Sequence, residues 1–266
     1  MAFVLKSKIS LITGGATGIG FCSVKELLRN GVKAVTIADI DEKRGQEALN
    51  EITKEFGPNR ALFIKTDVTK TDQLEAAFQE TINKWKAVDV VINNAAIMND
   101  GQRQLEISLN CGALVEGSFL ALKYMGKDKG GKGGVIVNMA SIAGLKPADV
   151  LPVYCATKHF VVAFSRSLGL PYHYDRTGVR VLTLCPGATN TNLLPESLQH
   201  PLNYSKEIGE RLDIALKNIP LQEPEYVAQA MATVITKGES GSVWVAEDSK
   251  PPYQVHIPDR EELPRK

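Results

Sequence analysis

The sequence alternates between short runs of β-branched and other apolar residues and longer stretches with helical periodicity. Strands are predicted at 8–13, 33–39, 61–66, 88–93, 135–139, 179–184 and 242–245. Helices are predicted at 19–30, 42–56, 71–86, 104–125, 152–172 and 224–236. Strand–helix alternation of this kind places parallel strands in one sheet with helices on both faces. The pattern therefore predicts an α/β fold, a doubly wound parallel sheet of about seven strands.

The length and charge of the chain limit what else it can be. Its 266 residues carry a formal net charge of +1, so they offer no basic excess for nucleic acid or an anionic membrane. Neither a membrane span of about 20 apolar residues nor a metal site is predicted. Four scattered cysteines favour a reduced, cytoplasmic protein. We expect one catalytic domain at 1–248, which includes a substrate lid at 188–221, and a C-terminal surface tail at 249–266.

A glycine-rich loop joins the first predicted strand to the first predicted helix, with the sequence TGGATGIG from Thr13 to Gly20. Glycines let the backbone approach a pyrophosphate closely, and the N-terminus of the following helix attracts phosphates. Asp39 ends the second strand, where a carboxylate accepts hydrogen bonds from a ribose and repels a 2′-phosphate, which favours NAD over NADP. The alternatives are a glycine turn without a ligand and an Asp39 that only caps the next helix.

A second chemical signal is the pair Tyr154 and Lys158, which are four residues apart and share one face of a predicted helix. An ammonium group about 4 Å from a tyrosine lowers the pKa of its hydroxyl group toward neutrality. Ser141 follows the fifth predicted strand and is placed to hold a substrate oxygen. A tyrosine and a lysine at this spacing also occur on ordinary solvated helix faces, so the pair alone does not establish catalysis.

Several motifs occur together in a fixed order. They are the loop at 13–20, Asp67-Val68, Asn93-Asn94-Ala95, Ser141, Tyr154-x-x-x-Lys158 and Pro186-Gly187. On these motifs the chain resembles the short-chain dehydrogenase/reductase family over nearly its whole length, which implies a Rossmann-type fold. Residues 153–159 (VYCATKH) are similar to the NAD-dependent 15-hydroxyprostaglandin dehydrogenases, and Thr189 and Thr191 are similar to the insect-type alcohol dehydrogenases.

The resemblance implies roles for four catalytic residues. Tyr154 would be the general acid and base, and Lys158 would lower its pKa and hold the nicotinamide ribose. Ser141 would orient the substrate oxygen, and Asn110 would hold a water that links Lys158 to solvent.

The resemblance also implies the residues that bind NAD. Asp67 would contact the adenine amino group, and Thr191 would contact the nicotinamide carboxamide. The full set implied for the cofactor is Gly14, Thr17, Gly18, Ile19, Gly20, Asp39, Ile40, Asp67, Val68, Asn94, Lys158, Pro186, Thr189 and Thr191.

The sequence departs from the family pattern at a few positions. Ala96 replaces the usual glycine after Asn93-Asn94-Ala95, so its backbone must avoid positive φ or accept strain. Pro171 should kink or end the catalytic helix early. Leu151 stands where the prostaglandin enzymes carry a polar residue, which favours a more apolar substrate.

Substrate selection is expected from the lid at 188–221. Apolar residues recur there at helical spacing, at Ile208, Leu212, Ala215, Leu216 and Ile219. Such a helix closes over a site, or it is an ordinary surface helix packed on the core. The residues expected to line the entrance are Leu145, Leu151, Leu193 and Leu194.

The leading hypothesis is an NAD-dependent oxidoreductase that acts on an apolar or lipid-like secondary alcohol, or on its ketone. The alternatives are an NADP-dependent carbonyl reductase and a non-catalytic NAD-binding protein. A homodimer is expected through the helices at 104–125 and 152–172, as is common in the family. Small residues on their outer faces would permit close approach, although they equally suit packing against the sheet: Gly117, Ala121, Ala163 and Ser167.

Overall fold

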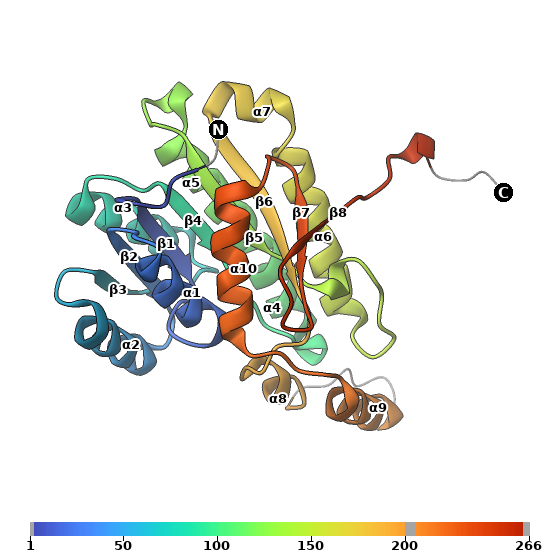
Figure 1. The fold of residues 1–266 in the computed structure, drawn as a ribbon. Helices are drawn as coiled ribbons and strands as arrows, with labels where there is room; N and C mark the ends of the chain where they lie inside the picture. The colour runs from blue at the N-terminus through green and yellow to red at the C-terminus, as the bar shows by residue number, and fades with distance from the viewer. Residues whose placement is uncertain (1–2, 200–205, 263–266) are drawn as a thin grey trace.

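A computed structural model describes residues 3–199 and 206–262, and its central feature is one eight-stranded sheet (Figure 1). The strand order is β3-β2-β1-β4-β5-β6-β7-β8. The first seven strands are parallel, which confirms the doubly wound fold expected from the sequence. Their bounds are β1 Ile9–Thr13, β2 Ala34–Asp39, β3 Ala61–Lys65, β4 Val90–Asn93, β5 Gly134–Met139, β6 Val179–Pro186 and β7 Val243–Ala246.

The last strand, β8 (Tyr253–Val255), lies inside the segment that was expected to be only a surface tail. It pairs with β7 in the antiparallel direction. Three residues preceded by two prolines give no detectable alternation, so the sequence pattern missed this strand. Arg166 also holds the segment beyond β8, because its guanidinium donates a hydrogen bond of 3.2 Å to the Ile257 carbonyl.

Helices cover both faces of the sheet. One face carries α1 (Gly18–Arg29), α2 (Glu42–Phe56) and α10 (Pro224–Lys237). The opposite face carries α3 (Thr71–Trp85), α5 (Leu114–Met125) and α6 (Pro152–Leu168). The shorter helices are α4 (Arg103–Ile107), α7 (Pro171–Thr177), α8 (Leu193–Ser197) and α9 (Lys206–Asn218).

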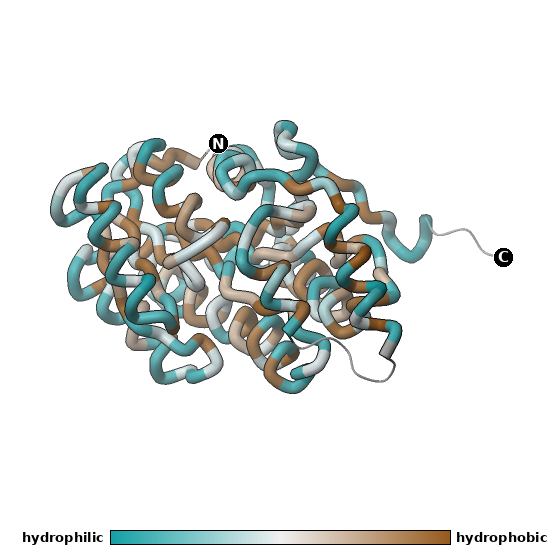
Figure 2. Tube along the Cα trace, turned by 90° about the horizontal axis from the view of Figure 1, so that it is seen from below, coloured by the Kyte–Doolittle hydropathy of each residue, from teal (hydrophilic) through white to brown (hydrophobic). Residues whose placement is uncertain are grey.

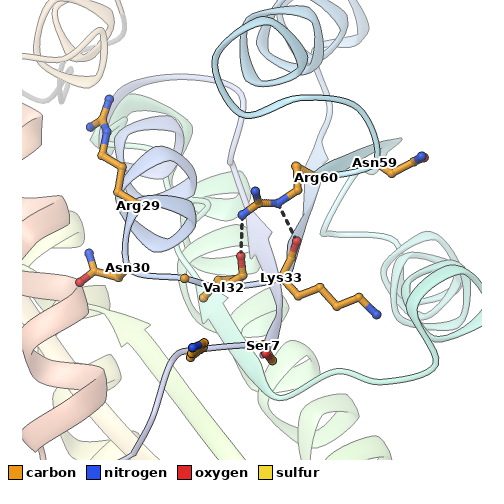
Figure 3. Close-up of a pocket in the computed structure, with 9 residues that line it drawn as sticks. Ser7, Arg29, Asn30, Val32, Lys33, Asn59 and Arg60 are labelled. Atoms are coloured by element: carbon orange, nitrogen blue, oxygen red, sulfur yellow. Dashed lines mark hydrogen bonds between the residues drawn. The ribbon is translucent and has the colours of Figure 1, made fainter.

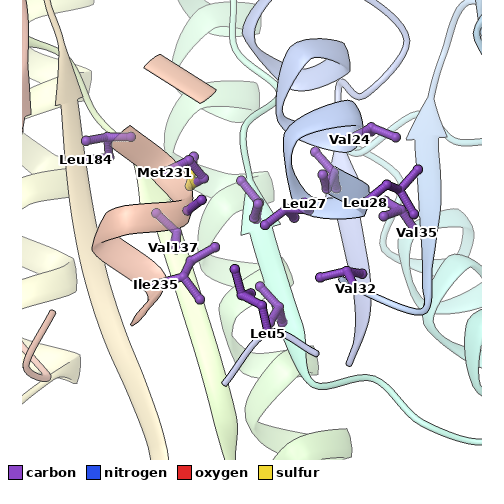
Figure 4. Close-up of a cluster of buried hydrophobic side chains, with 14 of the residues drawn as sticks. Leu5, Val24, Leu27, Leu28, Val32, Val35, Val137, Leu184, Met231 and Ile235 are labelled. Carbon is purple, nitrogen blue, oxygen red and sulfur yellow. The ribbon is translucent and has the colours of Figure 1, made fainter. Parts of the chain in front are cut away.

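The core consists of the apolar residues between the helices and the sheet. Successive residues of a strand point to opposite faces, so Ile12 packs toward α1 and α10 while Leu11 packs toward α3 and α5. In Figure 4, Leu27 of α1 and Met231 of α10 both lie in the buried cluster on this face of the sheet. Seen from below in Figure 2, hydrophilic residues line the outer sides of the helices and hydrophobic ones lie toward the middle.

A chain of buried polar side chains crosses this apolar core. The Asn93 amide donates hydrogen bonds to Ser118 Oγ at 3.1 Å and to Asn138 Oδ1 at 2.8 Å. The Asn138 amide in turn donates to Ser165 Oγ at 2.9 Å. Asn93 and Asn138 lie opposite each other in the register of β4 and β5. These hydrogen-bonded side chains therefore connect α5, β4, β5 and α6 in one fixed arrangement.

The catalytic-helix candidate ends where Pro171 requires. Helix α6 stops at Leu168, and Pro171 begins the separate helix α7. Pro171 lacks the backbone N–H that the helix interior needs, and it suits a first helical position. The sequence prediction that this proline ends the helix early is confirmed.

The long helical stretch Asp100–Met125 bears on the expectation that the chain has no membrane span. It has 26 residues and is long and apolar enough to cross a membrane by length and composition, although no such segment was predicted. In the fold, 44% of its most apolar window is buried, and α5 packs against α3, β4 and β5. It is a partly buried core helix.

The four small residues of α5 and α6 divide between the two places that the sequence allowed, an outer helix face and the packing against the sheet. Gly117 and Ala121 are buried, and a Cβ added at Gly117 would lie 2.3 Å from Asn93 Oδ1. These two residues therefore pack toward the sheet, whereas Ala163 and Ser167 on α6 are exposed as expected.

Truncation of the buried core should destabilise the protein strongly. Leu27→Ala removes a side chain that is 0% exposed, and we expect the free energy of unfolding to fall by about 2–5 kcal/mol because a cavity remains. Urea denaturation measures this change. The matched control is Leu170→Ala, at a residue that is 57% exposed, with an expected effect within about 0.5 kcal/mol. Equal losses in the two variants would contradict the placement of Leu27 in the core.

Candidate active site

The glycine loop lies where the strand order reverses. The chain adds β2 and β3 on one side of β1 and then crosses to place β4 on the other side. In open α/β sheets, ligands bind at such a reversal, in the crevice outside the carboxyl ends of the strands, here those of β1 and β4. Gly14 and Gly18 have φ values of +62° and +53°. A Cβ added at Gly20 would lie 2.1 Å from the Gly14 carbonyl oxygen. Larger residues at these three positions would therefore strain or displace the loop.

Asn94 holds this loop from the end of β4. Its amide donates hydrogen bonds of 3.0 Å to the carbonyl oxygens of Thr13 and Gly14. The Asn94 backbone N–H in turn donates to Thr13 Oγ at 3.0 Å. The side chain predicted to contact the cofactor is thus occupied in shaping the loop.

Asp39 lies beside the same loop. Its Oδ2 atom accepts a hydrogen bond of 2.9 Å from the Ala16 backbone N–H, and its Oδ1 atom accepts one of 3.1 Å from Asp41. The cap of α2 is Asp41, whose side chain accepts from the Arg44 N–H. This removes the alternative that Asp39 only caps the next helix. A carboxylate oxygen has a second lone pair, so both oxygens can still accept from a ribose.

The start of α1 is open to a ligand. Thr17 is the N-cap residue, is exposed, and makes no side-chain capping bond to the described part of the chain. The first N–H groups of α1 therefore face the crevice without a side-chain acceptor at the cap position. Ile19, in the first turn, is half-buried against the core.

The remaining cofactor candidates follow the ends of neighbouring strands. Thr191 faces the loop, since a Cβ added at Gly18 would lie 3.2 Å from its Cγ2 atom. Asp67 follows β3, and its Oδ1 atom accepts from the Thr69 hydroxyl at 2.6 Å. Val68 is buried, whereas Ile40 is 62% exposed.

Pro186 ends β6, and Thr189 after it is buried. The Thr189 hydroxyl donates 2.9 Å to the Gly187 carbonyl, so its side chain is directed to the protein rather than to the crevice.

The four predicted catalytic residues come together at the same edge of the sheet. Tyr154 and Lys158 lie on α6, and the Lys158 Nζ atom is 5.6 Å from the centre of the Tyr154 ring. The ammonium group donates a hydrogen bond of 3.0 Å to the carbonyl of Met139 at the end of β5. Ser141 follows that strand and hydrogen-bonds the Tyr154 side chain. Lys158 is only 2% exposed and Tyr154 7%.

Asn110 lies in a π-helical turn, Ser108–Ala113, between α4 and α5. Its amide donates to the Ile97 carbonyl at 2.8 Å and to Thr157 Oγ1 at 3.2 Å, and its Oδ1 atom accepts from the Ile97 N–H at 2.9 Å. It therefore joins the segment after β4 to the catalytic-helix candidate beside Lys158. Ala96, in that segment, is not among the described residues with positive φ, so the missing glycine causes no such strain.

Burial dominates the electrostatics of this cluster. It lowers the pKa of Lys158 to about 8, because an ammonium group loses its hydration in the interior. Burial also raises the pKa of Tyr154 well above its ordinary value, although the hydrogen bond with Ser141 acts in the opposite direction. From the sequence we expected Lys158 to lower the pKa of Tyr154. In the protein alone, desolvation of the phenol raises it instead.

Two acidic residues at the site were not found by sequence reasoning. Asp100 is 1% exposed and Glu106 is 0% exposed, and both lie next to the start of α6. Burial, and then the charge of Asp100, raises the pKa of Glu106 to about 7. The segment DGQRQLE reads as an exposed polar stretch, so the sequence carries no signal that these carboxyl groups are enclosed.

The expected lid helix packs against the segment that precedes α6. Ile208 and Leu212 of α9 are buried with Val150, and Leu151 packs against them. Ala215 and Ile219, which were expected on the same apolar face, are exposed, so the buried face is narrower than predicted. Arg211 of α9 also forms an ion pair with Asp149.

The other entrance candidates are only partly buried. Leu145 packs beside Ala140 and Val161, next to Ser141, and Leu193 and Leu194 lie on α8. In Figure 1, α8 and α9 lie together below the sheet, at the edge where β6 ends.

A separate surface depression of about 640 Å³ lies at the opposite edge of the sheet (Figure 3). It is lined by Lys6, Lys33, Arg29 and Arg60 among others. The Arg60 guanidinium donates to the carbonyls of Lys33 and Val32, and Arg29 pairs with Glu55. The two arginines of this depression are therefore engaged by other groups of the protein.

The chain is similar to dehydrogenases of one family. Residues 8–201 match the family model for short chain dehydrogenases. Human 15-hydroxyprostaglandin dehydrogenase (NAD+) is 32% identical over 263 residues, 98% of this chain and 97% of its own length. Alcohol dehydrogenase 2 of Ceratitis cosyra is 35% identical over 247 residues, 91% of this chain and 92% of its own.

A solved structure shares the fold. The 3-ketoacyl-(acyl-carrier-protein) reductase from Brucella melitensis, complexed with NADH, matches with a TM-score of 0.73 at 24% identity, over 91% of this chain and 96% of its own. The near-complete matches in sequence show that the chain belongs to the short-chain dehydrogenase/reductase family, as the motifs indicated. It is an oxidoreductase of that family whose relatives act on alcohols.

Proposed function

We propose that this protein is an NAD-dependent dehydrogenase of apolar secondary alcohols that also reduces the corresponding ketones. One observation carries the proposal. Tyr154, Lys158, Ser141 and Asn110 are gathered in a buried cluster at the sheet edge that also holds the glycine loop and Asp39. The family and its alcohol-oxidising relatives support the same chemistry.

The crevice fits a nicotinamide dinucleotide. The glycine loop and the open start of α1 would receive the pyrophosphate, and Asp39 would bind the adenosine ribose. Asp67, Val68 and Ile40 follow β3 and β2, where the adenine would lie, and Pro186 and Thr191 follow β6 on the nicotinamide side. The carboxylate of Asp39 favours NAD because a 2′-phosphate would meet a negative charge there. When bound, the nicotinamide ring accepts a hydride from the alcohol carbon.

The side chains of this protein handle the proton. Ser141 holds the substrate oxygen, and the Tyr154 oxygen takes the hydroxyl proton as the alcohol becomes a ketone. In the reverse direction Tyr154 returns that proton. Because burial raises the pKa of Tyr154, its ionised form depends on positive charge nearby, which Lys158 supplies.

Apolar contacts would select the substrate. Leu151 and α9 present aliphatic surface close to the start of α6, and Leu145, Leu193 and Leu194 extend it. A secondary alcohol on a hydrocarbon chain, including a hydroxylated fatty-acid derivative, matches this surface better than a phosphorylated or strongly charged one. The catalytic domain would carry this reaction in the cytoplasm, and it includes β8 from the segment 249–266, because that strand pairs with β7.

We also infer a homodimer formed through the outer faces of α5 and α6. Phe119 and Phe160 are 52% and 42% exposed, and their ring centres lie 6.3 Å and 5.9 Å from that of Phe164. An aromatic cluster of this kind is unfavourable in water and favours burial against a second copy.

Loss of the Tyr154 hydroxyl should abolish turnover. With a panel of apolar secondary alcohols, we expect Tyr154→Phe to lower kcat by about 10²–10⁴-fold, because the proton acceptor is missing. NADH formation measures the rate, and the Kd for NAD should change little. Tyr172→Phe, at a residue that is 71% exposed, is the control. Full activity of Tyr154→Phe would sink the mechanism.

Neutralising Asp39 should weaken the preference for NAD. We expect Asp39→Asn to lower the ratio of kcat/KM with NAD to that with NADP by about ten- to a hundredfold, the value of one charge-assisted hydrogen bond. Asp41→Asn, two residues away, retains the cap of α2 and should leave the ratio unchanged. A wild-type preference for NADP would refute the cofactor assignment.

The dimer can be tested by light scattering. The wild-type protein should have about twice the mass of one chain, and the double variant Phe119→Glu, Phe160→Glu should have the mass of one, because charge is not tolerated in an apolar interface. Tyr172→Glu is the exposed control. A monomeric wild-type protein would contradict the proposal.

A further inference from the structure

Asp100 connects a neighbouring segment to the first turn of the catalytic helix. Its Oδ2 atom accepts a hydrogen bond of 2.7 Å from the Val153 N–H, and its Oδ1 atom accepts one of 3.1 Å from the Tyr154 N–H. The N-cap residue of α6 is Leu151, whose aliphatic side chain cannot accept a hydrogen bond. Asp100 therefore replaces the missing cap from outside the helix, and one of its bonds ends on Tyr154 itself.

Glu106 lies behind Asp100 and is fully enclosed. Its Oε1 atom accepts from the Asn99 N–H at 2.9 Å, and the two carboxyl groups lie close enough for each to shift the pKa of the other. Its Oε2 atom has no donor among the described residues. Two enclosed carboxyl groups this close to each other are costly to ionise together, so we expect one of them to hold a proton. Asp100 already accepts two backbone N–H bonds, which favour its ionised form, so the proton belongs on Glu106.

Whether Glu106 carries a proton affects the titratable groups around the pair. Lys158 and Tyr154 face it from α6, Cys155 lies on the same helix, and Cys111 faces it from the π-helical turn. An ionised Glu106 raises the pKa of Tyr154 by direct repulsion. It would also repel the Asp100 carboxylate that holds the start of α6. Protonated, Glu106 has neither effect.

We propose that Asp100 and Glu106 form a proton-sharing carboxyl pair that positions Tyr154 for proton transfer and keeps an opposing charge away from it. These two are positioning residues, since they act through α6 and do not touch the reacting atoms. The inference rests on the proposed function for its effect on turnover, but the pair itself can be tested without any substrate.

The first experiment compares the Tm of wild type and Glu106→Gln from about pH 5 to about pH 8.5. Glutamine reproduces the protonated form, because its amide donates to Asp100 and its oxygen accepts from Asn99. A carboxyl group whose pKa is raised on folding costs stability as pH increases from its ordinary value to the raised one. We therefore expect the Tm of the variant to rise relative to wild type between about pH 5 and about pH 7, and then to stay level. Glu80→Gln, on the exposed side of α3, should show no such trend.

A difference in Tm that is the same at every pH would overturn the shared proton. If the glutamine variant does not fold, wild-type protein still tests it by infrared spectroscopy. The band of a protonated carboxylic acid should be present at about pH 5.5 and lost by about pH 9. Absence of that band at the lower pH would also overturn the pair.

The second experiment measures positioning. Asparagine at 100 can accept only one of the two N–H bonds, so Asp100→Asn should lower kcat by about tenfold, with a change in the Kd for NAD below about twofold. In Glu106→Gln, the midpoint of the rise of kcat with pH should move to lower pH. If wild type turns over alcohols but neither the loss of kcat nor the shift of the pH midpoint appears, the proposal that this pair positions Tyr154 is wrong. If no alcohol is turned over, the proposed function fails while the Tm result still decides the pair.

Discussion

The buried hydrogen bonds from Ser118 through Asn93 and Asn138 to Ser165 hold together the elements on which the site depends. Each polar group is enclosed by apolar residues, so a shift of α6 against β4 and β5 would leave a donor or acceptor unpaired. Such a loss costs about 1–3 kcal/mol for each group. The register of these strands and the place of α6 are therefore set together. Because Tyr154 and Lys158 lie on α6, the same hydrogen bonds fix their positions.

The free-energy cost of burying charge dominates the electrostatics of the site. Lys158 is enclosed at the end of β5, where the Met139 carbonyl supplies a partner and burial still lowers the pKa of the amine. Tyr154 is pushed toward its neutral form by the same enclosure. An ionised Glu106 carboxylate would raise the pKa of Tyr154 further. A proton on Glu106 prevents this rise. Small changes of charge in such an interior have large effects because solvent does not screen them.

Much of the fold was predictable from the chain alone. The seven parallel strands follow from apolar runs that are buried on both faces, and the break between α6 and α7 follows from Pro171. The strand β8 was missed because its partner, β7, supplies the order that three residues cannot specify by themselves. The sequence left open whether Gly117 and Ala121 form an outer face or pack against the sheet, because small residues suit both places, and the fold packs both toward the sheet.

The sequence by itself determined the chemical inventory of the site, since the glycine loop, Asp39, Ser141, Tyr154 and Lys158 occur at spacings that local strand and helix geometry can translate into one edge of a sheet. Only the tertiary structure decided which carboxyl groups are enclosed. Asp100 and Glu106 stand in a polar stretch, and their burial arises because the segment after β4 folds back over the start of α6. The tertiary structure also decided which way the pKa of Tyr154 moves. Burial depends on atoms brought from distant parts of the chain, and no local pattern records it.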